Sequence, residues 1–166
     1  MHHDSVDLFE LSRRLSTARR LAQGIEPPSR VDPDFSLADG YTVGRLLAEE
    51  QVQRGVRRVG AKLGFTNQMV WSELGLSTPF WSPIYDTAVT DTRSVSLAGL
   101  VQPRIEPEII LGFDTELPAG ATLRAIRAAN GEGVAGCGVV PGHYPPVERQ
   151  PASANGSARG RGGEAR

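Results

Sequence analysis

The sequence is poor in the residue types that mark several common classes of protein. Its 166 residues contain a single cysteine, Cys137, which excludes an intramolecular disulfide and a cysteine-rich zinc site. No uninterrupted apolar run is long enough to predict a membrane-spanning helix. The N-terminal segment has early acidic residues and no apolar stretch of the secretory type, so we do not expect it to be a secretory signal.

The sequence also lacks a large excess of positive or negative charge, because the net charge is −1 and the isoelectric point is about 6.3. A balanced surface of this kind does not predict binding to nucleic acid or to a membrane surface. The length fits one domain. We therefore expect a soluble, cytoplasmic protein with neither a nucleic acid nor a membrane as its partner.

Lysine is the scarcest charged residue, with one copy against 17 arginines. Lys62 lies between glycines in residues 60–64 (GAKLG). Lysine and arginine are not interchangeable where a site needs a compact ammonium or a pKa that can shift. Lys62 is therefore a candidate functional residue, although on the residues alone a solvent-facing lysine placed by chance is an equal alternative.

Apolar periodicity and capping signals predict two N-terminal helices. The first covers residues 5–22 and is followed by Gly24 as a stop signal. Ser36 opens the second, and Ser36 with Asp39 resembles a capping box. Gly55 ends this helix. In chain order the remaining expected elements are a glycine-interrupted strand at 56–65, with a bulge or close backbone approach, a helix at 67–74 with Thr66 as N-cap and Gly75 as stop, a strand within 79–90, a short strand at 94–97, a strand at 104–113 and a helix at 123–129.

The composition changes after about residue 130. Residues 131–166 hold nine of the 19 glycines and show neither a strand-like nor a helical apolar period. We expect residues 1–130 to be the folded part and residues 131–166 to be a disordered tail rich in Gly, Ala, Pro and Arg. GC-rich DNA gives the same composition when it is read out of frame, so a truncated or frameshifted chain is a hypothesis.

Two carboxylates stand on either side of a proline in residues 103–110 (PRIEPEII). In an extended strand Glu106 and Glu108 share one face with Arg104. Pro107 has no N–H to donate, so it suits an edge strand or a bulge. The two acids fit a metal site, acid–base chemistry or the solvated face of a half-buried strand, and the residues alone do not choose among these.

Three segments together resemble the 2-keto-4-pentenoate hydratase / 4-oxalocrotonate decarboxylase family of the fumarylacetoacetate hydrolase-like superfamily. They are residues 60–67 (GAKLGFTN), 79–86 (PFWSPIYD) and 103–109 (PRIEPEI), and the resemblance covers about residues 5–129. It implies an α/β (α+β) fold in which N-terminal helices precede part of a mixed, rolled β core, with the C-terminal part missing.

The resemblance also implies a site. Glu106 and Glu108 would bind Mg²⁺ or Mn²⁺, which are hard cations that prefer oxygen ligands. Lys62 would be the catalytic residue that binds the substrate's oxygen groups or assists proton transfer. The family's third metal carboxylate follows a helix, in a run with Glu and then Asp-Ser-Arg. No Asp-Ser-Arg occurs here, so no third ligand is assigned.

The implied activity is that of a metal-dependent hydratase that adds water to 2-hydroxypenta-2,4-dienoate-type substrates in the breakdown of aromatic compounds. The metal would act as a Lewis acid. Decarboxylation of a 2-oxo dioic acid, of the 4-oxalocrotonate type, is a close alternative. A truncated, non-catalytic protein or subunit is the alternative of another class. The implied partners are a small 2-oxo or 2-hydroxy-dienoic acid and either further copies of the chain or a related decarboxylase or hydratase.

Overall fold

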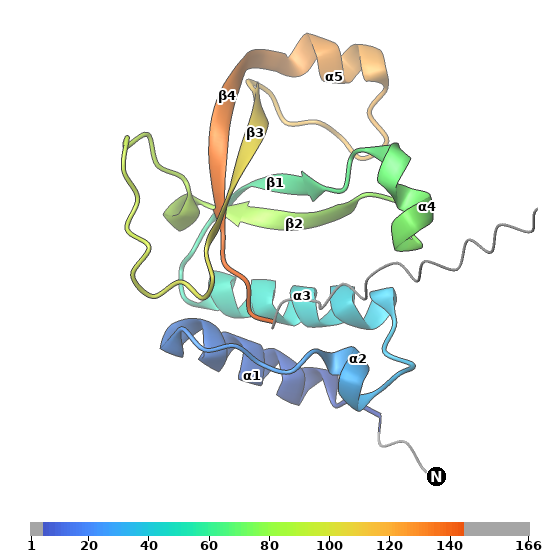
Figure 1. Cartoon of the computed structure of the whole chain (residues 1–166). Helices are drawn as coiled ribbons and strands as arrows, with labels where there is room; N and C mark the ends of the chain where they lie inside the picture. The colour runs from blue at the N-terminus through green and yellow to red at the C-terminus, as the bar shows by residue number, and fades with distance from the viewer. Residues whose placement is uncertain (1–4, 145–166) are drawn as a thin grey trace, which may run out of the picture.

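The computed structural model of the chain describes residues 5–144, which form a layer of helices and two separate antiparallel pairs of strands (Figure 1). None of the helices in this part of the chain has the length and hydropathy needed to span a membrane. In chain order the elements are α1 (Leu8–Leu21), α2 (Pro28–Val31), α3 (Leu37–Gln53), β1 (Arg58–Gly64), η1 (Gln68–Val70), α4 (Trp71–Leu74), β2 (Phe80–Tyr85), η2 (Asp86–Ala88), β3 (Arg104–Phe113), α5 (Leu123–Ala129) and β4 (Asn130–Val140).

The apolar core lies between α1 and α3, and the helical periodicity predicted only part of it, since the exposed Phe9 and Leu21 belonged to the expected stripe. It consists of the buried side chains Leu11, Leu15, Val43 and Leu47. The predicted capping box of α3 is confirmed, because Ser36 and Asp39 each accept a backbone N–H of the other. These caps satisfy donors that the first turn of a helix otherwise leaves unpaired.

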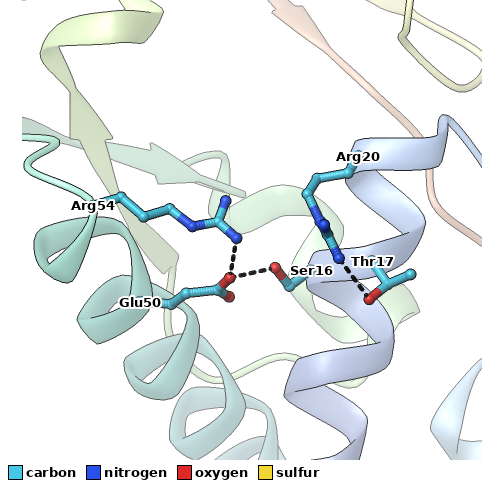
Figure 2. A network of polar contacts seen from close by, with 5 residues as sticks. All are labelled: Ser16, Thr17, Arg20, Glu50 and Arg54. Atoms are coloured by element: carbon cyan, nitrogen blue, oxygen red, sulfur yellow. Dashed lines mark hydrogen bonds and ion pairs between the residues drawn. The ribbon is translucent and has the colours of Figure 1, made fainter.

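A polar contact also joins the two long helices (Figure 2). The Ser16 hydroxyl on α1 donates to Oε1 of Glu50 on α3 at 2.8 Å. Arg54, at the C-terminal end of α3, donates to the same carboxylate oxygen. Ser16 is buried, so its hydroxyl needs such a partner to avoid a desolvation penalty.

The predicted strand after α3 is confirmed as β1, which pairs with β2. Its register shifts between Arg58 and Gly60, which is the irregularity that the glycines predicted. The expected N-cap Thr66 is wrong by one residue, because the Asn67 side chain accepts the N–H of Met69. Gly75 ends α4 in the left-handed conformation, as predicted.

The prediction of a disordered segment from residue 131 is wrong over the described residues. Asn130–Val140 form β4, which pairs antiparallel with β3 along nearly its whole length. The chain then returns to the helical layer, where the Ile25 N–H donates to the His143 carbonyl at 2.7 Å. Residues 145–166 lie outside the described part. The short strand expected at 94–97 is also wrong, because those residues join no sheet.

Burial is uneven across the molecule. The β3 face that carries Ile105, Ile109 and Leu111 is open, with Ile109 83% exposed. No other strand of the described residues pairs with β3 or β4, so both are edge strands, which suits Pro107. Stability therefore depends mainly on the packing of α1 against α3.

Replacing Leu11, which is 3% exposed, with alanine should lower the free energy of unfolding by about 2–5 kcal/mol, because it removes buried methyl groups and leaves a cavity. Urea denaturation measures this change. Leu21→Ala is the matched control on the same helix, since Leu21 is 59% exposed and should cost about 0.5 kcal/mol or less. Equal losses for the two variants would contradict this assignment of the core.

Candidate functional site

Three sequence-predicted site residues meet where the two strand pairs approach each other. The Lys62 ammonium on β1 donates to Glu106 Oε2 on β3 at 2.7 Å and also bonds Glu108 Oε1. The residues lie 44 and 46 positions apart in the sequence. The fold therefore brings together all three side chains that the resemblance singled out.

The strand period explains why both carboxylates reach one ammonium. Glu106 and Glu108 are two residues apart on β3, so their side chains project from the same face. Pro107 lies between them and projects from the other face. The predicted shared orientation is confirmed by the two bonds to Lys62.

The cluster is half-buried, and this strengthens its electrostatics relative to a fully exposed pair. The side chains of Lys62, Glu106 and Glu108 are 29%, 46% and 28% exposed. Burial acts to lower the pKa of Lys62, but the hydrogen bonds and charges of the two carboxylates together raise it above its usual value. The hydrogen bond from Lys62 lowers the pKa of Glu106.

The strand beside the carboxylates carries glycines, and sequence analysis missed their importance. Gly138 pairs with Glu106 and Gly136 pairs with Glu108, so both lie on the face of the cluster. A Cβ at Gly138 would stand 3.1 Å from Lys62 Nζ and 3.3 Å from Glu108 Oε1. The available signal was two glycines spaced by two residues, which is hard to recognise without the strand register.

The residues that are present do not fit a divalent cation as they stand. Within the described part of the chain, no group of three or more His, Cys, Asp or Glu side chains could hold a metal ion. The two carboxylates are bonded to an ammonium, and Mg²⁺ loses its own hydration water reluctantly. A metal at Glu106 and Glu108 would need Lys62 to move away and other oxygens to complete the shell.

An apolar groove of about 890 Å³ lies elsewhere, between α3 and β2. Tyr41 and Trp81 stack along it with ring centroids 6.0 Å apart. Its lining includes none of the three cluster residues. The cluster is the better candidate for chemistry, because three charged groups from β1 and β3 are in direct contact there.

Comparisons with known proteins agree with the resemblance. The chain is 32% identical over 132 residues to a 4-oxalocrotonate decarboxylase from Pseudomonas sp., an alignment that covers 75% of this chain and 51% of that protein. It is 30% identical over 135 residues to a 2-keto-4-pentenoate hydratase from Paraburkholderia phymatum, covering 75% and 52%. The chain is a relative of the 2-keto-4-pentenoate hydratases and 4-oxalocrotonate decarboxylases. No family model matches it.

The fold of this hydratase and decarboxylase relative is confirmed by a solved structure. The 4-oxalocrotonate decarboxylase from Pseudomonas putida G7, complexed with magnesium and adipate, matches with a TM-score of 0.76 and 24% identity. The match covers 85% of this chain and 54% of that one. The chain thus spans about half the length of the relatives that it matches.

Replacing Lys62 with methionine should destabilise the protein at pH 7 more than in acid. Lys62 holds the folded pKa of Glu106 below its usual value, so the ionised form stabilises the protein above the unfolded pKa, and this contribution is lost as the pH falls through the folded pKa. The raised pKa of Lys62 keeps its ammonium charged throughout this range. Urea denaturation of both proteins at a series of pH values measures the difference.

Arg45→Met is a control for the loss of one positive charge. Arg45 pairs with Glu49 on the exposed surface of α3, where such a pair contributes about 0.3–0.5 kcal/mol. A Lys62→Met effect at pH 7 no larger than that of Arg45→Met would show that the cluster adds nothing beyond an ordinary surface pair.

Proposed function

We propose that this chain carries the site of a hydratase that adds water to 2-hydroxypenta-2,4-dienoate-type acids, with Lys62, Glu106 and Glu108 as its site residues. The observation that carries the proposal is the convergence of these three side chains from β1 and β3. Sequence relatives that are hydratases and decarboxylases of small organic acids support the reaction class.

Lys62 is the residue that would bind the substrate's oxygen atoms. Its pKa is raised, so the ammonium stays charged near neutral pH and would donate hydrogen bonds rather than act as a base. The lowered pKa of Glu106 keeps that carboxylate ionised, so it would accept a proton rather than supply one. A charged hydrogen-bond donor would stabilise a negative enolate oxygen, and an ionised carboxylate would accept a hydrogen bond from water.

Charge favours the hydratase over the decarboxylase. One ammonium and two carboxylates give the cluster a net charge of −1 when all three are ionised. A 2-hydroxydienoate is a monoanion, whereas a 4-oxalocrotonate-type acid is a dianion and would be repelled more strongly. The decarboxylase neighbour that holds the dianion adipate also contains magnesium. Mg²⁺ or Mn²⁺ is therefore a variable of the assay, because a bound divalent cation would make the net charge of the cluster positive and remove this preference.

The test supplies the purified chain with each substrate in turn. Loss of the absorbance of the conjugated 2-hydroxypenta-2,4-dienoate reports hydration, and CO₂ release from 4-oxalocrotonate reports decarboxylation, each with and without millimolar Mg²⁺ or Mn²⁺. We expect hydration, and a fall in kcat/KM of about 100-fold or more in Lys62→Met, since a positioned hydrogen-bond donor to a developing negative charge contributes on that scale. Arg45→Met should keep its activity. CO₂ release without hydration would overturn the hydratase assignment.

A non-catalytic role is the second candidate, and a specific observation favours it. Within the described residues the carboxylate pair lacks a third metal-ligating side chain and is held by an ammonium. A protein of this kind would act by association with further copies of itself or with a related hydratase or decarboxylase. Absence of both activities at every metal concentration, with folding intact, would support this role over the hydratase.

A further inference from the structure

Gly138 lies beside the cluster on β4, where it contributes backbone and no side chain. It pairs directly with Glu106, so any side chain at this position would project from the same face as the two carboxylates. The first atom of such a side chain would already lie 3.1 Å from Lys62 Nζ and 3.3 Å from Glu108 Oε1. A side chain there would therefore compete directly with the ammonium for its place.

The neighbouring glycine does not offer the same opportunity. A Cβ at Gly136 would stand 2.5 Å from Ile110 Cδ1, so a side chain there first meets an apolar branch. At Gly138 the nearest atom is the terminal nitrogen of Lys62, whose side chain can adopt another conformation if a new group takes its place beside the carboxylates.

We propose that glycine at position 138 makes this cluster a site for an internal cation, the Lys62 ammonium, in place of a divalent metal ion. Two carboxylates and one ammonium satisfy one another, whereas a third carboxylate at position 138 would complete an oxygen-rich set suited to Mg²⁺ or Mn²⁺. The proposal concerns the same residues as the proposed hydratase activity, but it requires no turnover.

The experiment measures Mn²⁺ binding by the full chain, from the loss of the electron paramagnetic resonance signal of free Mn²⁺. Gly138→Glu should bind Mn²⁺ at least about tenfold more tightly than the wild-type chain, because affinity rises with the number of charged oxygen ligands. Wild-type protein should not bind at millimolar Mn²⁺. Calorimetric titration with Mg²⁺ should give the same order of affinities.

Two control variants test whether tighter Mn²⁺ binding by Gly138→Glu comes from a carboxylate at that position rather than from added charge or size alone. Gly138→Gln has nearly the same shape without the charge. Gly133→Glu adds the same charge to β4, but its position pairs with Leu111 on the opposite face of the strand. Neither variant should bind Mn²⁺ more tightly than the wild-type chain does.

Tight Mn²⁺ binding by the wild-type chain would overturn the proposal, as would equal affinities of Gly138→Glu and Gly133→Glu. Circular dichroism and thermal melting check folding, and Gly138→Asp, which is one methylene shorter, takes the place of Gly138→Glu if the longer side chain prevents folding. Failure of the hydratase assay leaves these affinities unchanged, so the two proposals fail separately.

Discussion

The hydrogen-bonded contact between one ammonium and two carboxylates is the constraint on which the site depends. Lys62 belongs to the first pair of strands and Glu106 and Glu108 to the second, and the two pairs form separate sheets. A backbone ladder fixes each pair internally, but it does not fix one pair against the other. The position of the carboxylates relative to β1 therefore depends on side-chain charge and hydrogen bonding, which are sensitive to pH and to ligands in a way that a packed core is not.

Backbone pairing explains how a glycine-rich segment can form one wall of this site. β4 contributes little apolar surface, yet its N–H and C=O groups pair with those of β3 through a long register. Its missing side chains leave room for the lysine to reach the carboxylates, as Gly138 shows. The same absence of side chains gives β4 little packing of its own, so its order depends on β3.

The sequence predicts those parts of the fold that local patterns determine. The helices follow from apolar periodicity and from caps such as Ser36 and Asp39, and β3 follows from its aliphatic run. β4 was not predicted because glycines carry no apolar period, and its order arises from pairing with β3, which lies before α5 in the chain. The contact of Lys62 with the two glutamates could likewise not be predicted from periodicity, since it depends on how the two strand pairs approach each other. The family resemblance identified Lys62 and the two glutamates as site residues. The strand register of β4 was needed to identify Gly138 as their neighbour.

The two roles of Lys62 conflict with each other. The ammonium joins the two pairs of strands, and in the proposed reaction the same ammonium would bind the substrate. Any oxygen of an anionic ligand that draws Lys62 away leaves Glu106 and Glu108 facing each other and the ligand, all with negative charge. That arrangement is unfavourable in a half-buried site unless a second cation binds the two carboxylates. Substrate binding and the joining of β1 to β3 therefore oppose each other in a chain with glycine at position 138, and a cation bound by the carboxylates would release Lys62 for the ligand.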